Sequence, residues 1–296
     1  MMDYSQLAAL AAIHRRGSFD LAAVALSVTP SAISQRLKAL EERMGALLIR
    51  RGQPCAATDH GLRLIRHFEE VMLLESTLAA DLPEGPAPTT IRIAVNADSL
   101  AIWVLPALAA TAGVLFDLVI DDQDHSQYLL RSGEVSAAIT SHPGPLQGCD
   151  TIALGALRYR ATASPAYIAR WMPDGATRAA LARAPALTFS DKDRLQRDWI
   201  AAHLAGDPGA ASARFTFPTH RIASSQGFVE AALLGLGWGM NPEPLIATHL
   251  AQGRLAELAP DTPLDVPLYW QFTRLTATAL APLTRAIITA SAKHLL

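Results

Sequence analysis

A short polar segment at a strand-to-helix junction holds the residues best suited to binding a small acid. Asn96 ends the strand expected at 91–96, and Asp98 and Ser99 open the helical pattern that follows. The first turn of a helix offers unpaired backbone N–H groups and partial positive charge, and both stabilise a bound carboxylate. Ser99 adds a hydroxyl donor. The simpler alternative is that Asp98 only caps its own helix.

Aspartates close to this junction are candidate partners for a cationic group. Asp121 and Asp122 end the next expected strand, at 115–121. Carboxylates bind ammonium and guanidinium groups through charge-assisted hydrogen bonds. Thr140 ends a third strand, at 135–140, and is a further candidate contact. The two aspartates also fit an ordinary solvated acidic loop.

Ser224 and Ser225 form a second strand-to-helix junction, directly before a helix expected from Gln226. In a domain of two lobes, this junction would face the first one across a cleft. A helix N-cap explains the two serines equally well, because serine is a preferred N-cap residue.

Near the N-terminus, polar residues project from the start of a helix in a pattern suited to DNA. Thr29 and Pro30 fit an N-cap and a first helical position, and the first turns then carry Ser31, Ser34, Gln35, Arg36 and Lys38. Glutamine and lysine contact base edges in the major groove, whereas serine, arginine and a helix N-terminus suit phosphates. Arg50 and Arg51 lie on an expected hairpin, or wing. The alternative is an ordinary polar helix face in a bundle.

The sequence lacks the usual signatures of enzymes and metal sites. It contains neither a His-Glu-x-x-His pattern nor a Gly-x-Ser-x-Gly elbow, and its two cysteines, Cys55 and Cys149, do not form a Cys-x-x-Cys pair. We therefore expect no catalytic site, no metal and no cofactor.

Three helices, a hairpin and a long helix are expected to carry the DNA-contacting residues. An apolar face at helical spacing predicts the first helix, which ends at Arg15-Arg16-Gly17. Ser18 would cap a second helix at 20–26, and the third spans 32–44, which makes a helix-turn-helix. After a hairpin at 47–52 comes a long helix from about Thr58, whose apolar stripe favours pairing with a second copy and comprises Leu64, Phe68, Val71 and Leu78.

Strands and helices alternate in the rest of the chain. Strands 91–96, 115–121 and 135–140 alternate with helices 99–110 and 123–131, which predicts an α/β domain with a mostly parallel sheet. A similar pattern recurs between residues 163 and 260. Two α/β lobes that face each other enclose a cleft, where small ligands usually bind.

The charge distribution separates these two parts. The 296 residues carry a net charge of −2, yet residues 1–68 hold nine basic and five acidic groups, and the remainder holds 16 basic and 22 acidic groups. A basic head on an acidic body is typical of a nucleic-acid-binding module attached to another domain. With 50% hydrophobic residues and no apolar run of membrane-spanning length, we expect a globular cytoplasmic protein with no membrane partner.

The N-terminal motif resembles the winged helix-turn-helix of the LysR-type transcriptional regulators. The residues that carry this resemblance are Phe19, Ala22-Ala23, Leu26, Val28 to Leu37, Leu40-Glu41, Gly45, Leu48, Arg50-Arg51, and Thr58 with Gly61. Asp20 departs from the pattern, because that position is often neutral or basic in the family.

The second half is similar to the branch of this family that controls the export of basic amino acids, the lysine-export activators and arginine regulators. The matching segments are 94–101, Trp103, 105–108, 131–135 and 268–270. The resemblance implies an all-α winged head, a long linker helix and a two-lobed α/β domain folded like a periplasmic binding protein. It also implies lysine or arginine as effector, promoter DNA and RNA polymerase as partners, a homodimer or homotetramer, and activation of an exporter gene.

On this basis we divide the chain into three parts. Residues 1–58 form the DNA-binding domain, 59–88 the dimerisation helix and hinge, and 89–296 the effector-binding domain. Within the last part, lobe I covers about 89–162 and 266–296, and lobe II about 163–265. Two alternatives remain: a regulator of the same type with another effector, such as an aromatic acid, or an α/β enzyme or solute-binding protein with an accessory helical domain.

Overall fold

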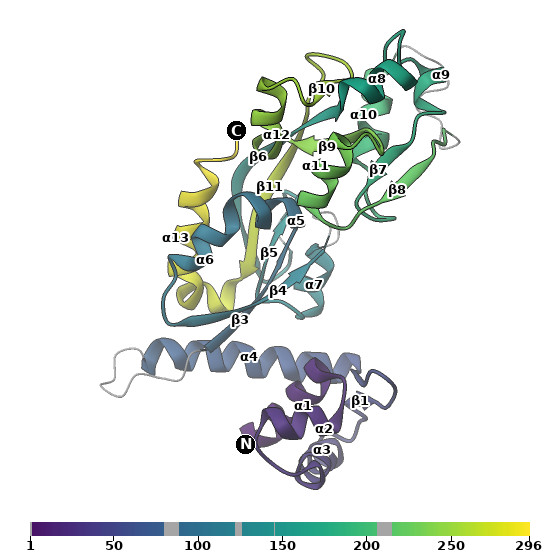
Figure 1. Ribbon diagram of the computed structural model, residues 1–296. Helices are drawn as coiled ribbons and strands as arrows, with labels where there is room; N and C mark the ends of the chain where they lie inside the picture. Colours follow the sequence, from purple (N-terminus) through teal and green to yellow (C-terminus); the bar gives the residue numbers. More distant parts are fainter. Residues whose placement is uncertain (1, 80–88, 122–125, 145, 206–214) are drawn as a thin grey trace.

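A small helical head, a long helix and a larger α/β domain follow one another along the chain (Figure 1). The computed structural model describes residues 2–79, 89–121, 126–144, 146–205 and 215–296. The head and the long helix comprise α1 (Tyr4–Arg16), α2 (Phe19–Ala25), α3 (Pro30–Met44), β1 (Ile49–Arg50), β2 (Ala56–Ala57) and α4 (Asp59–Ala79).

Local capping chemistry sets the ends of the head helices. The Thr29 hydroxyl accepts a hydrogen bond from the Ala32 N–H, and α1 and α3 end at Gly17 and Gly45, whose φ angles of 67° and 66° are left-handed. Glycine adopts that conformation without steric cost. Ser18 occupies the N-cap position of α2, as expected. The expected capping hydrogen bond was wrong, because the Ser18 side chain makes none.

One buried face of α3 orients its opposite face outward. Ile33, Leu37 and Leu40 are at most 2% exposed and pack in the head core with residues of α1, α2 and the hairpin. Their spacing of four and three residues keeps them on a single helix face. The Glu41 carboxylate then fastens the hairpin to α3, because it accepts hydrogen bonds from the backbone N–H groups of Leu48 and Ile49.

Helix α4 packs against both the head and the α/β domain, between which it lies in Figure 1. Leu64 and Phe68 pack on the head core, whereas Leu73, 4% exposed, belongs to the core of the α/β domain. Val71 is partly buried, and the side chain of Leu78 lies outside the described part of the chain. Part of the predicted apolar stripe is therefore used within one subunit, and its role in dimerisation stays a prediction.

The α/β domain is built on a seven-stranded mixed sheet. Six of its strands follow the order β10-β6-β11-β5-β3-β4. The seventh, β9, pairs with residues 159–162 of β6. The strands are β3 (Thr89–Val95), β4 (Val114–Ile120), β5 (Ala137–Thr140), β6 (Cys149–Ala163), β9 (Gly239–Pro242), β10 (Ala256–Glu257) and β11 (Leu264–Thr273).

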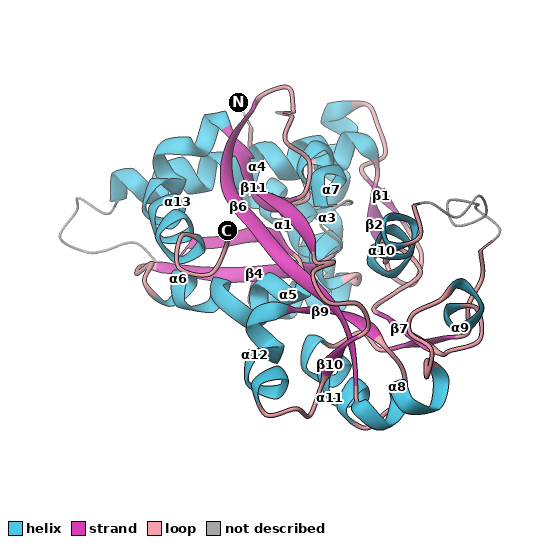
Figure 2. Ribbon diagram, turned by 90° about the horizontal axis from the view of Figure 1, so that it is seen from above, coloured by secondary structure: helices cyan, strands magenta, loops and turns pink. Residues whose placement is uncertain are grey.

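The expectation of a mostly parallel sheet was wrong. Only the pairings of β3 with β4 and with β5 are parallel among the described strands of this sheet, and the others are antiparallel. The long strands β6 and β11 pair over ten residues and run side by side through the domain (Figure 2). Sequence reasoning missed both strands, because it followed only the alternation of strands and helices.

Helices surround this sheet, and a smaller parallel pair of strands is linked to it by an isolated bridge between Ala186 and Trp238, directly before β9. The pair consists of β7 (Ala186–Thr188) and β8 (Thr219–Arg221). The helices are α5 (Ala97–Ser99), a π-helical turn (Leu100–Val104), α6 (Leu105–Ala109), α7 (Ser126–Ser132), α8 (Pro165–Trp171), α9 (Arg178–Leu181), α10 (Leu195–His203), α11 (Ser225–Leu233), α12 (Glu243–Ala251), a 3-10 turn (Arg274–Thr276) and α13 (Ala277–Ser291).

Large aromatic side chains fill the core of this domain. Trp103, Trp199, Trp238 and Trp270 are at most 1% exposed and pack in this core. None of the described helices is both long and apolar enough to span a bilayer.

Candidate functional site

The first candidate site is the outward face of α3. The side chains of Thr29, Pro30, Ser31, Ser34, Gln35 and Lys38 are exposed there, and Arg36 is partly exposed. The Thr29 and Ser31 hydroxyls are 2.9 Å apart, and Lys38 lies 3.7 Å from Glu42 in a weak ion pair. The N-terminal half of α3 thus presents hydrogen-bonding side chains to solvent next to a capped helix N-terminus.

Two arginines flank this face on the hairpin. Arg50 and Arg51 are both exposed. The Arg50 guanidinium donates to the Ala57 carbonyl at 3.5 Å, and that of Arg51 lies 5.4 Å from the centre of the Phe19 ring. The predicted wing is therefore a short hairpin with two cationic side chains.

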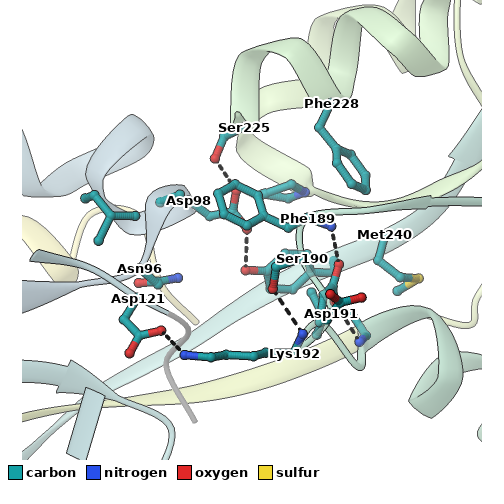
Figure 3. A pocket seen from close by; sticks show the side chains of 16 residues that line it. Asn96, Asp98, Asp121, Phe189, Ser190, Asp191, Lys192, Ser225, Phe228 and Met240 are labelled. Atoms are coloured by element: carbon teal, nitrogen blue, oxygen red, sulfur yellow. Dashed lines mark hydrogen bonds and ion pairs between the residues drawn. The ribbon is translucent and has the colours of Figure 1, made fainter. Parts of the chain in front are cut away.

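The second candidate site is a cavity of about 380 Å³ in the α/β domain. A cavity of this size accommodates a small metabolite. It lies at the carboxyl ends of β3 and β4, and its other walls come from β6, the 189–193 loop, β9 and the start of α11 (Figure 3). Because β4 and β5 flank β3 on opposite sides, the chain reverses its winding direction here, and such switch points bind ligands in open α/β sheets.

Asp98 is a partly buried carboxylate of the cavity wall. It accepts hydrogen bonds from the Tyr159 hydroxyl at 2.8 Å and from the Ser225 hydroxyl at 2.6 Å. Burial raises the pKa of Asp98, and the two hydrogen bonds act in the opposite direction. Asp98 joins the helical run after β3 to β6 and to the N-terminus of α11.

The 189–193 loop, called here the lysine loop, closes one side of the cavity. The Asp193 carboxylate holds its fold, because it accepts hydrogen bonds from the backbone N–H groups of Phe189 at 2.8 Å and Leu195 at 3.0 Å. Burial also raises the pKa of Asp193. At the tip, the Lys192 ammonium group lies 2.9 Å from a carboxylate oxygen of Asp121 (Figure 3).

Two polar atoms beside the cavity are buried without a hydrogen-bond partner among the described residues. They are Oδ1 of Asn96 and Oγ of Ser99. Asn96 lines the cavity, and Ser99 stands behind it in the first turn of the helical run 97–109. Because unpaired buried polar groups cost free energy, they indicate a place for a ligand or an ordered water.

The structure brings together four of the residues singled out from the sequence. Asn96, Asp98, Asp121 and Ser225 line the cavity. Ser99, Thr140 and Ser224 are outside its lining: the Thr140 hydroxyl accepts from the His142 N–H, and Ser224 caps α11 through the Gly227 N–H. Asp122 lies outside the described residues.

Sequence reasoning missed Tyr159, the lysine loop, Phe228 and Met240, which also line the cavity. Tyr159 and Met240 belong to the antiparallel part of the sheet, which was not predicted in full. The sequence Ser-Asp-Lys-Asp at 190–193 did offer a signal, since it is a charged cluster within the alternating pattern expected between residues 163 and 260.

Comparison with known families assigns both parts of the chain. Residues 4–62 match the model of the bacterial regulatory helix-turn-helix proteins of the lysR family, and residues 84–295 match the LysR substrate binding domain. The chain therefore belongs to the LysR family of transcriptional regulators. The family match confirms the interpretation as a DNA-binding regulator rather than an enzyme.

Full-length similarity places the chain more narrowly, among regulators of the ArgP and LysG type. It is 42% identical over 301 residues to the transcriptional regulator ArgP of Pseudomonas fluorescens, covering all of this chain and 99% of the relative. The crystal structure of ArgP from Mycobacterium tuberculosis has a TM-score of 0.82 at 42% identity, covering 100% and 99% of the two chains. Full-length LysG from Corynebacterium glutamicum with bound effector arginine has a TM-score of 0.72 at 36% identity, covering 99% of each chain.

The raised pKa of Asp98 predicts a pH-dependent stability that Asp98→Asn removes. Between the ordinary aspartate pKa of about 4 and the raised value, the folded protein binds more protons than the unfolded chain. The free energy of unfolding from this group therefore falls as pH rises through that range. As pH rises through this range, the free energy of unfolding of Asp98→Asn should increase relative to that of the wild type, and above the range the difference should stay constant. Urea unfolding from pH 4.5 to 8 measures this difference.

Asp174→Asn is the matched control, because Asp174 is exposed. Its pH profile supplies the baseline against which the Asp98→Asn profile is compared. An Asp98→Asn profile that matches this baseline would contradict the assignment of the pH dependence to Asp98.

Proposed function

We propose that this protein binds promoter DNA through its head and that a basic amino acid, arginine or lysine, binds in the cavity and controls transcription. The observation that carries the proposal is the placement of Asp98 and Asp121 on one cavity wall, beside the N-terminus of the helical run 97–109. An α-amino acid with a cationic side chain needs both kinds of partner. The bound arginine of the similar LysG structure supports the same ligand class.

In the proposed orientation, the α-carboxylate and the cationic side chain of the ligand bind to different groups of the cavity wall. The α-carboxylate would lie at the first turn of the helical run, where helix N–H groups and the Ser99 hydroxyl are donors. The cationic side chain would extend toward Asp121, and Asp98 with Ser225 would bind the α-ammonium group. Asp122, Thr140 and Ser224 stay predicted contacts, and a closed, ligand-bound form has to bring Thr140 and Ser224 closer to the ligand.

The aromatic-acid alternative loses support from the position of Asp121. A ligand without a cation would leave Asp121 paired with Lys192 and would gain no attraction from the carboxylates of the cavity wall. Because Asp121 lines the cavity rather than facing away from it, the acidic wall favours a cationic ligand.

In the head, Gln35 and Lys38 are the proposed base-contacting residues. Ser31, Ser34 and Arg36, with Arg50 and Arg51 on the wing, are the proposed phosphate contacts, and Thr29 and Pro30 form the helix N-terminus that would face the DNA backbone. An exposed helix face flanked by cationic side chains is the arrangement that other helix-turn-helix proteins place in the major groove. We expect this function in the cytosol, with no resident cofactor.

Ligand binding must alter the DNA-binding assembly through a difference in affinity between two conformations. In the proposed mechanism, the amino acid bridges the lobes, and the resulting shift changes the spacing of heads in a homodimer or homotetramer paired through α4. Better recruitment of RNA polymerase to an amino-acid exporter gene would then follow.

The ligand assignment predicts a selective thermal shift. Arginine and lysine should raise the melting temperature of the purified full-length protein, whereas citrulline and benzoate at equal concentration should raise it little. Asp121→Asn should lose at least about tenfold in affinity for both basic amino acids, the scale of a charge-assisted hydrogen bond. Asp174→Asn, at an exposed residue outside the cavity lining, should bind as the wild type does. A shift with benzoate but not with arginine or lysine would refute the assignment.

The DNA assignment predicts different losses for two exposed residues. Gln35→Ala should weaken binding to the specific promoter by about 1–3 kcal/mol while leaving bulk DNA binding nearly unchanged, because a base contact is lost. Arg50→Ala should weaken both and lower the salt dependence by about one released ion, because a phosphate contact is lost. Fluorescence anisotropy at several salt concentrations measures these effects. Equal losses on both DNAs for Gln35→Ala would show that Gln35 does not read bases.

A further inference from the structure

The ion pair between Lys192 and Asp121 crosses the cavity from one lobe to the other. Asp121 follows β4 of lobe I, and Lys192 belongs to the lysine loop, between β7 and α10 of lobe II. The ammonium nitrogen lies 2.9 Å from the carboxylate oxygen, and the Asp121 side chain is 21% exposed. In Figure 3 the Lys192 side chain extends along the cavity toward Asp121.

The backbone of the lysine loop is held without any help from this ion pair. The Lys192 N–H donates to the Ser190 hydroxyl at 3.1 Å, and the Asp193 carboxylate accepts from the backbone on both sides of it. Lys192 is thus presented from a loop with its own hydrogen-bonded structure. Its long, flexible stem can leave Asp121 while the loop keeps its fold.

A cation on the wall of a cavity that binds cationic ligands requires an explanation. Lys192 is the single basic residue among the described residues that line the cavity, and it contacts the carboxylate proposed for the ligand side chain. The Lys192 ammonium group is identical to the cationic end of a lysine ligand and carries the same charge as the guanidinium of an arginine ligand. Lys192 and the effector therefore need the same partner.

We propose that Lys192 is a built-in competitor of the effector, which pairs with Asp121 while the cavity is empty and is displaced by the cationic end of the ligand. This inference rests on the proposed function and adds a specificity-determining residue to it. Displacement lowers the affinity for every basic amino acid, since one ion pair is exchanged for another. A neutral ligand of similar shape leaves the ion pair in place and gains nothing from Asp121.

The experiment measures arginine, lysine and citrulline binding by isothermal titration calorimetry on the full-length protein. Lys192→Met removes the charge and keeps an unbranched stem. It should bind arginine and lysine about two- to fivefold more tightly than the wild type, the range expected for a partly exposed ion pair. Citrulline binding should not tighten. Lys192→Arg keeps the charge and should not show the gain, and Lys293→Met, at an exposed site near the C-terminus, should bind as the wild type does.

A double-mutant cycle isolates the competition. In an Asp121→Asn background, Lys192→Met should change arginine affinity by less than about 1.5-fold, because the shared partner is gone. Weaker or unchanged arginine binding by Lys192→Met would overturn the proposal, as would an equal gain in the Asp121→Asn background. If the wild type binds neither arginine nor lysine, the proposed function itself fails, whereas wild-type binding without a gain in Lys192→Met refutes only the competitor.

Discussion

Two hydrogen bonds to the Asp98 carboxylate connect three of the structural elements that form the cavity. Asp98 lies in the first turn of the helical run after β3, Tyr159 lies on the long strand β6, and Ser225 begins α11. Burial raises the pKa of the partly buried Asp98 carboxylate, and the hydrogen bonds that both of its oxygens accept stabilise its charged form. The shape of the cavity, and with it the placement of the acidic wall, depends on this three-way junction.

Strand β3 links the cavity to the DNA-binding half of the chain. Its carboxyl end leads to Asn96 and the cavity, and its other end packs near α4, which buries Leu73 in the same core. On its other side α4 contacts the head, where the Arg15 guanidinium donates to Glu69 at 2.6 Å. Burial raises the pKa of Glu69, and Arg15 opposes that shift by stabilising the charged form. A continuous series of packed elements thus connects the cavity to the head.

The head was predictable from sequence because its signals are local. The N-cap at Thr29, the glycines at 17 and 45, and the helical spacing of Ile33, Leu37 and Leu40 each determine structure within a few residues. The same locality explains the junctions at Asn96 and Asp121, which parallel pairing of β3 with β4 brings together.

Contacts between segments far apart in the chain were not predictable in this way. Asp98 meets Ser225 across 127 positions, and Lys192 meets Asp121 across 71, so neither pairing follows from residue spacing. The long antiparallel strands β6 and β11 and the wall residue Tyr159 on β6 were missed for the same reason. A single sequence shows which residues can bind charge, whereas the fold decides which of them face the same cavity.

A crystal structure of the full-length protein with arginine tests the central claim most directly. The account predicts one arginine in the cavity, with its α-carboxylate at the first turn of the helical run 97–109 and its guanidinium within hydrogen-bonding distance of Asp121. Arginine bound outside this cavity, or bound there with the guanidinium directed away from Asp121 and Asp98, would contradict it.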